Sequence, residues 1–203
     1  MSDWQILQDE ISVCEVCRQQ FPTIRVDCPP GLILPPDLTP PNPVKILFVG
    51  VAPPEKGRHF YTASQDNLRD GLFKTLTELG RPCRSMTDFL AHNFLLLHTA
   101  KCAIKGTTSP NLSVAQFCAV QHLKREIELL RPEAVCWLSK SVGYPVCRTL
   151  SQKWGTPKVP FGTVFSVSIL GRDTRFIATN WPGRGWEKDT KEHLRRLLDT
   201  LSS

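Results

Sequence analysis

Residues 44–54 read VKILFVGVAPP, and this stretch decides the fold. From Ile46 to Gly50 it is an unbroken apolar run, a pattern typical of a strand buried on both faces of a parallel sheet. The strand cannot run on through Pro53 and Pro54, because proline lacks the backbone N–H that a central strand requires. The stretch therefore predicts a buried strand that stops at Gly50 and opens into a loop.

The rest of the chain alternates between strand and helix patterns. Ser113 and Gln116 form a capping-box pattern at the start of one predicted helix. The alternation predicts an α/β fold, a three-layer α/β/α sandwich with helices on both faces of a central, mostly parallel sheet. Apolar runs predict further strands at 94–100, 133–138, 164–169 and 175–179, and helical spacing predicts helices at 67–79, 113–130, 141–152 and 187–201.

A chain of 203 residues fits one large domain, and we expect a single domain over residues 1–203. Within residues 1–43, a short predicted helix at 3–13 leads to a pair of cysteines and then to seven prolines between residues 29 and 43. Prolines at this density exclude a helix or a central strand. The proline-rich segment could link two domains, but the part before it is too short to fold alone. We therefore expect a belt that packs on the body.

Four cysteines have a spacing that suits metal binding. Cys14 and Cys17 form a C-x2-C pair, in which a short turn can direct two thiolates at one centre, and Cys102 and Cys118 follow near the ends of a predicted strand and helix. Such a set can close around an iron–sulfur cluster or a zinc ion. The alternative is that these are ordinary buried cysteines or disulfides.

Charge and hydropathy indicate where in the cell the protein is located and which kinds of partner it binds. The sequence shows no signal peptide and no apolar run that could cross a membrane, so we expect a cytoplasmic monomer with no membrane partner. A net charge of +6 favours a polyanionic partner, and nucleic acid is the obvious candidate, although a merely basic surface would look the same. Basic residues crowd the C-terminal quarter, at Arg172, Arg175, Arg184, Lys188, Lys191, Arg195 and Arg196.

Open parallel sheets bind ligands in loops beyond the carboxyl ends of their strands. The loops after Gly50, His98, Leu138 and Thr179 should therefore converge on one crevice. In the first loop, Arg58 could hold a phosphate, and aromatic side chains could stack on a flat ligand, although core packing explains Phe60 equally well. The candidates from this loop are Gly50, Val51, Ala52, Pro53, Glu55, Arg58, His59, Phe60 and Tyr61.

The last of these loops reads TNWPGRGW at residues 179–186. An apolar wedge with basic neighbours is what a protein needs in order to push into duplex DNA and unstack a base step. Trp181, Arg184 and Lys188 are therefore candidate DNA-binding residues. The alternative is a rigid turn whose tryptophans fold back on the core.

Taken in order, these features resemble the iron–sulfur branch of the uracil-DNA glycosylase superfamily. That branch has an N-terminal C-x2-C, a strand that ends in glycine before an x-A-P loop, a GRPF segment, a strand that ends in Lys-Cys, a later helix cysteine and an Arg-Pro before a strand. The likeness runs from Cys14 to about Gly185. The matching segments are the C-x2-C at 14–17, FVGVAPP at 48–54, GRHF at 57–60, Lys101-Cys102, Cys118 and Arg131-Pro132.

The resemblance implies a [4Fe–4S] cluster on Cys14, Cys17, Cys102 and Cys118. It also implies that an extruded base stacks on Phe60, and that the backbone from Gly50 to Pro53 lines the deoxyribose and the hydrolytic water. The physical reason for extrusion is general, because a base inside a duplex is out of reach of an active site.

Three positions depart from the family pattern. His98 occupies the place of the asparagine that usually reads the uracil edge, and an imidazole offers a differently shaped donor and acceptor. The usual His-Pro-Ser motif is replaced by a stretch that begins at Asn180 and contains no histidine. Val51 stands where a polar residue normally follows the glycine, so that Glu55 is the nearest carboxylate, with His59 as a further polar group. His98, Glu55 and Asn180 are accordingly our catalytic candidates.

These departures lead to one preferred function and two alternatives. We expect a DNA glycosylase that flips a damaged or modified base out of DNA and hydrolyses its N-glycosidic bond. Uracil stays among the candidate bases, together with a deaminated purine, a bulky lesion or a modified phage base. The first alternative is a relative that binds DNA lesions without catalysis. The second is a zinc-stabilised α/β protein with a small-molecule substrate.

Overall fold

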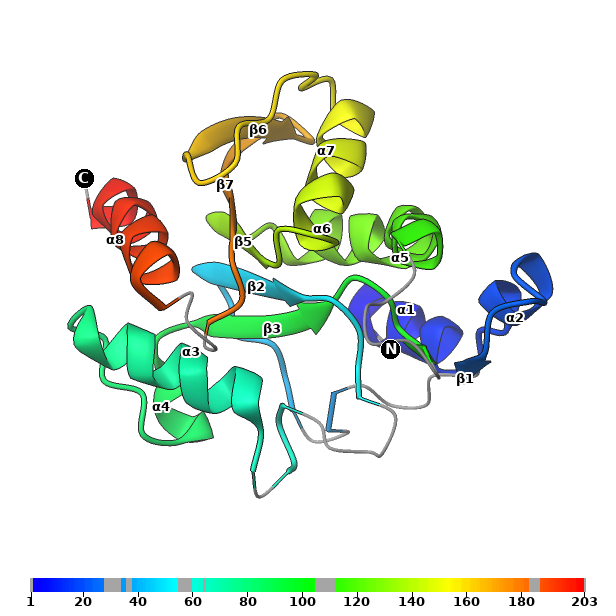
Figure 1. The fold of residues 1–203 in the computed structure, drawn as a ribbon, viewed down its shortest axis with the longest axis horizontal. Helices are drawn as coiled ribbons and strands as arrows, with labels where there is room; N and C mark the ends of the chain where they lie inside the picture. The colour runs from blue at the N-terminus through cyan, green and yellow to red at the C-terminus, as the bar shows by residue number, and fades with distance from the viewer. Residues whose placement is uncertain are drawn as a thin grey trace.

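The computed structural model of the protein describes residues 2–27, 34–35, 38–54, 60–63, 65–104, 112–182 and 187–202. Within these residues, the central sheet has five strands in the order β3-β2-β5-β7-β6 (Figure 1). All neighbouring pairs are parallel except β6 and β7, which are antiparallel. The strands are β2 (Ile46–Gly50), β3 (Phe94–His98), β5 (Ala134–Leu138), β6 (Phe165–Ile169) and β7 (Arg172–Thr179).

Helices cover both faces of this sheet, so the predicted α/β sandwich is confirmed (Figure 1). Along β2, Ile46 and Phe48 pack with one layer of helices, whereas Leu47 and Val49 pack with the other, because successive side chains of a strand point to opposite faces. One layer contains α3 (Asn67–Glu78), α4 (Met86–Ala91) and α8 (Glu187–Ser202). The other contains α5 (Leu112–Cys118), the π-helical turn η1 (Ala119–Leu123), α6 (Lys124–Leu130) and α7 (Gly143–Lys153).

The predicted helix at 113–130 exists, but it differs from the prediction in two ways. It begins at Leu112, so Ser113 lies inside the first turn and not before it. Gln116 donates a hydrogen bond to Thr149 of α7 at 3.1 Å, so its side chain joins two helices. The π-helical turn that directly follows Cys118 was not predicted.

The N-terminal segment is held against the body of the protein at two places. Helix α1 (Asp3–Ser12) lies against α6, where Arg125 pairs with Glu10 at 2.7 Å. Beyond the short helix α2 (Val16–Gln20), strand β1 (Val26–Asp27) pairs antiparallel with β4 (Ala103–Ile104), apart from the central sheet (Figure 1). Of the predicted proline belt, residues 34–35 and 38–43 are described, and residues 29–33 and 36–37 lie outside the described residues.

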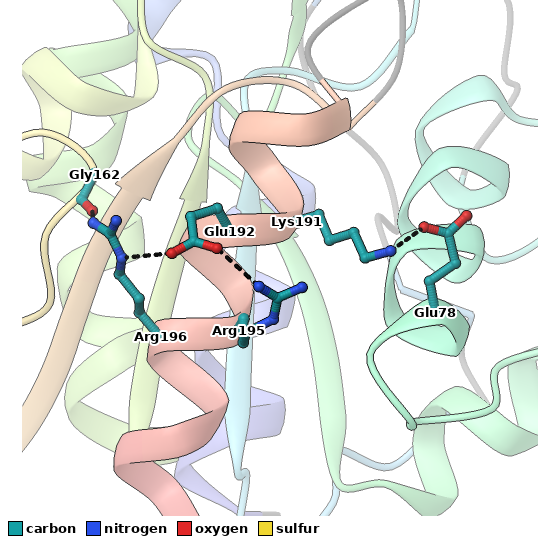
Figure 2. A network of polar contacts seen from close by, with 6 residues as sticks. All are labelled: Glu78, Gly162, Lys191, Glu192, Arg195 and Arg196. Carbon is teal, nitrogen blue, oxygen red and sulfur yellow. Dashed lines mark hydrogen bonds and ion pairs between the residues drawn. The ribbon is translucent and has the colours of Figure 1, made fainter.

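Helix α8 carries a network of charged contacts (Figure 2). Glu192 pairs with Arg195 at 3.0 Å and with Arg196 at 3.2 Å, and Lys191 reaches across to Glu78 of α3 at 2.8 Å. Arg196 also donates to the carbonyl of Gly162 at 3.3 Å. Three of the basic side chains in the C-terminal quarter are therefore paired with carboxylates, which reduces the positive charge that this region offers to DNA.

His193 of α8 should make the stability of the protein depend on pH. Burial, reinforced by the charge of Arg196, lowers the pKa of His193, whose Nδ1 lies 2.8 Å from the Thr179 hydroxyl. As the pH falls through about 6.5, His193 becomes protonated in the unfolded chain while it is still neutral in the folded protein. The free energy of unfolding should therefore drop on acidification, and drop less steeply in His193→Gln. Urea titrations between about pH 7.5 and 5.5 test this, and equal slopes would refute it.

Candidate active site and cysteine site

A cavity of about 260 Å³ opens at the carboxyl ends of the strands, where open α/β sheets bind ligands. Its walls come from the end of β3, from the loop after β2, from the start of α3 and from Trp181, two residues beyond the end of β7. This volume suits a single flat group such as a base. The described residues that line it are Ala52, Pro54, Phe60, Gln65, Asp66, Asn67, Leu68, His98 and Trp181.

Gly50 and His98 lie side by side at this end of the sheet, as partners in the β2–β3 register. A Cβ on Gly50 would lie 3.0 Å from Cδ2 and 3.3 Å from Nε2 of the imidazole, so the absence of a side chain lets the ring lie over the strand end. Thr99 fixes this geometry, because its N–H and its hydroxyl both donate to the Gly50 carbonyl, at 2.9 and 2.8 Å. His98 is 5% exposed and forms part of the cavity wall.

The two aromatic candidates of the first loop have different surroundings. Phe60 lines the cavity and also packs edge-to-face on Phe73 and Phe89, with ring centroids 6.0 and 5.4 Å apart, so the stacking role and the core role are compatible. The hydroxyl of Tyr61 donates to the carbonyl of Leu96 and accepts from its N–H, each at 2.8 Å. Tyr61 is not among the described cavity-lining residues. Its hydroxyl instead binds the backbone of β3, the edge strand of the sheet.

The loop after β2 contributes mainly apolar surface. Ala52 and Pro54 line the cavity, whereas Pro53 is buried. Val51 packs on the core layer of α5–α7, and its carbonyl accepts from the Ala100 N–H at 2.9 Å. Four of the predicted site residues, Glu55, Arg58, His59 and Arg184, lie outside the described residues.

The two residues that follow β7 have different surroundings: one lines the cavity and the other is buried in the protein. Trp181 lines the cavity while also packing on the core between α3 and α8. Asn180 is 6% exposed; its amide lies 3.4 Å from Asp189 and its carbonyl accepts from Thr190 at 3.3 Å. Asn180 is therefore a buried anchor for the start of α8 and is not among the described cavity-lining residues. Lys188 is exposed and borders a separate surface cavity with Lys74 and Lys191.

Three polar residues at the N-terminus of α3 line the cavity and were not predicted from the sequence, namely Gln65, Asp66 and Asn67. Asp66 is the N-cap of α3 and accepts the Arg69 N–H at 2.8 Å. An aspartate just before a periodic apolar run is a recognised helix-start signal. That signal, combined with the reversal of chain direction between β2 and α3, could have placed Asp66 at the same end of the sheet as Gly50.

Three of the four cysteines with metal-site spacing lie in one apolar cluster, and the fourth lies near the helix that carries one of them. Cys17, Cys102 and Cys118 share one apolar cluster, against which Ala52 of the cavity wall packs. The sulfur of Cys14 lies 3.2 Å from Nε2 of His122, on the helix that carries Cys118. None of the cysteines in the described part of the chain forms a disulfide.

The surroundings of Cys118 favour its thiolate, the form that binds metals. A hydrogen bond from Cys17, the charge of Lys101 and the Lys101 N–H lower the pKa of Cys118, against the opposing effects of burial and Glu126. The Lys101 N–H donates to the Cys118 sulfur at 3.2 Å. The surroundings of the Cys118 sulfur therefore fit a thiolate-bound group.

No three His, Cys, Asp or Glu side chains in the described part of the chain are placed to hold a metal ion. A zinc ion needs four ligands around one point, so the described side chains do not support the zinc alternative. An iron–sulfur cluster makes a different demand, because each cysteine binds its own iron and the sulfurs need not meet at one point.

A buried ion pair connects the cysteine site to the cavity wall. Lys101 and Glu126 are each 1% exposed, and their charged groups are in direct contact. The Lys101 ammonium also donates to the His98 carbonyl at 2.8 Å, and Gln8 of α1 donates to Glu126 at 3.2 Å. Lys101 therefore touches Cys118 through its backbone and His98 through its side chain.

Comparison with known families agrees with this geometry. The sequence model of the Uracil DNA glycosylase superfamily matches residues 36–201, which is most of the chain, and the protein belongs to this superfamily. Members of the superfamily act on DNA and generally hydrolyse N-glycosidic bonds. A search of curated proteins finds no match. Among the described residues, no helix combines the length and the apolar character needed to cross a membrane.

Proposed function

We propose that the protein is a DNA glycosylase that flips a damaged or modified base into the cavity beside His98 and hydrolyses its N-glycosidic bond. The observation that carries this proposal is the cavity itself. In a chain of this superfamily, it places a buried imidazole and an aromatic ring at the carboxyl ends of the strands. A base that enters it would leave the duplex stack, at a cost of a few kcal/mol that damaged or mismatched bases lower.

In this proposal the cavity residues act on the base side of the breaking bond. Phe60 provides a surface for the base, and Ala52 and Pro54 shape the entrance. His98 lies where a hydrogen bond can stabilise the negative charge on the departing base. Because an imidazole replaces the amide that usually reads uracil, we propose a base other than uracil as the preferred substrate.

Duplex oligonucleotides with one modified base test the function directly. The set contains uracil, hypoxanthine, xanthine and hydroxymethylcytosine derivatives, and alkali treatment converts each abasic site into a strand break. Breaks with at least one non-uracil base, at a rate above that with uracil, support the proposal. Tight binding of the modified duplexes without any abasic product would instead identify the protein as a lesion-binding relative.

We further propose that Cys14, Cys17, Cys102 and Cys118 hold a [4Fe–4S] cluster, which would place the protein in the iron–sulfur branch of its superfamily. The support is the thiolate-favouring surroundings of Cys118 and the apolar cluster that Cys17 and Cys102 share with it. The cluster's role is structural: bound there, it joins the N-terminal segment to β4 and to the helix that begins at Leu112.

Cys118→Ser should lose iron and stability together. Loss of one of four ligands weakens the site, and the binding energy of a structural metal group contributes to folding. The expected result is a colourless protein with little iron and a lowered urea midpoint. Cys136→Ser changes a buried cysteine of the sheet, so it controls for the packing cost and should keep its iron. Iron loss without any change in midpoint would contradict a structural role, and a zinc-loaded wild type would contradict the cluster.

A further inference from the structure

The cavity pairs two ionisable side chains from different elements. Among the described residues that line it, these are His98, at the end of β3, and Asp66, at the start of α3. Two titratable groups in unlike surroundings within one cavity are the usual arrangement for splitting a reaction between two roles. His98 is buried in the wall, whereas Asp66 is half-buried and accessible to water.

We infer that Asp66 is a catalytic residue whose carboxylate accepts a proton from the attacking water; this inference rests on the proposed glycosylase function. The reaction needs such a group because water is a poor nucleophile, and because a positive charge develops on the sugar as the bond breaks. The loop after β2 supplies Val51 at the position where a polar residue is usual. Asp66 brings a carboxylate to the same cavity from another element.

The hydrogen bonds around Asp66 leave one of its oxygens available. Oδ1 accepts the Arg69 N–H at 2.8 Å, and the backbone carbonyl accepts from Asp70 at 2.9 Å. Oδ2 has no hydrogen-bond partner among the residues that the structure describes. The guanidinium of Arg69 donates to the carbonyls of Ala63 and Phe60, at 2.8 and 3.2 Å, which ties the loop with Phe60 to the helix with Asp66. The carboxylate is thus held in place without losing its second acceptor.

The step can be written with all atoms accounted for. The oxygen of a water molecule bonds to C1′ of the flipped nucleotide as the bond between C1′ and the base nitrogen breaks. One water proton passes to Oδ2 of Asp66. The electron pair of the broken bond stays on the base nitrogen, where a hydrogen bond from His98 stabilises it until the base takes up a proton from solvent. The products are the free base and an abasic sugar with a 1′-hydroxyl group.

Asp66→Asn separates this role from helix capping. Asparagine caps helices as well as aspartate does, so α3 should keep its start and the urea midpoint should stay unchanged. The change removes the carboxylate, and the single-turnover rate of base release should fall about 10²-fold or more. Binding of the modified duplex should not weaken. Asp66→Ser, which also preserves the cap, should behave in the same way if Asp66→Asn fails to fold.

Asp70→Asn is the matched control. Asp70 lies one turn further along α3, its side chain is 63% exposed, and it is not among the described cavity-lining residues. The same charge is removed, but the rate should stay at the wild-type value. A full rate in Asp66→Asn would overturn the inference while leaving the glycosylase proposal intact. A wild-type protein that releases no base from any duplex would overturn both. A fall in rate explained by weaker DNA binding alone would also overturn the catalytic role.

Discussion

Lys101→Met is expected to lower the free energy of unfolding by about 3–5 kcal/mol, because it leaves the carboxylate of Glu126 buried without its counter-charge. Both side chains of this pair are 1% exposed, so water cannot replace the missing ammonium. The variant also removes the donor to the His98 carbonyl. Urea unfolding followed by circular dichroism at neutral pH measures the loss.

Two further variants show whether the uncompensated charge causes the effect. Lys101→Met combined with Glu126→Gln should recover much of the stability, since the amide keeps an acceptor for Gln8 and carries no charge. Arg125→Met breaks the neighbouring exposed pair with Glu10, and should cost about 1 kcal/mol or less. A loss of that small size in Lys101→Met would mean that the buried pair contributes no more than a surface one.

His98→Ala is expected to lower the rate of base release by about 10²- to 10⁴-fold, the usual contribution of a well-placed acid–base group. The imidazole is held by the strand register against Gly50 and faces the cavity. Its removal takes away the group proposed to stabilise the departing base. Single-turnover assays with the best modified duplex give the rate, and His92→Ala, at the end of α4, serves as the control that should remain fully active.

His98→Asn adds a test of specificity to this comparison. It introduces the amide that uracil-reading relatives usually carry at this position, so the ratio of uracil release to release of the preferred base should rise. An unchanged rate in His98→Ala would remove His98 from the proposed chemistry. A lost rate in both variants with no shift in preference would limit His98 to leaving-group stabilisation.

The sequence predicted the scaffold well because the scaffold depends on apolar patterning. The five predicted strands and the convergence of Gly50 with His98 follow from runs of apolar residues and from the parallel order that they imply. Helix α4 was missed although Ser85 and Asp88 form a true capping box, because its six residues are too few to show a helical period.

The side-chain contacts of the site were harder to predict. Lys101 and Glu126 are far apart in the sequence, and no local pattern reveals that they meet. Tyr61 and Asn180 looked like ligand-facing residues, but their polar atoms bond to Leu96 and to the start of α8. Composition cannot show whether a polar side chain points to a ligand or satisfies a neighbouring backbone, because both uses employ the same residue types.

The π-helical turn after Cys118 changes the directions in which the side chains before and after it point around the helix axis. In a regular α-helix, Cys118 and Glu126 would point about 80° apart, since eight residues at about 100° each exceed two full turns by that amount. One extra residue in the wide turn reduces this divergence to about 20°. Both side chains therefore face the same way, and a single lysine can reach a sulfur with its main chain and a carboxylate with its tip.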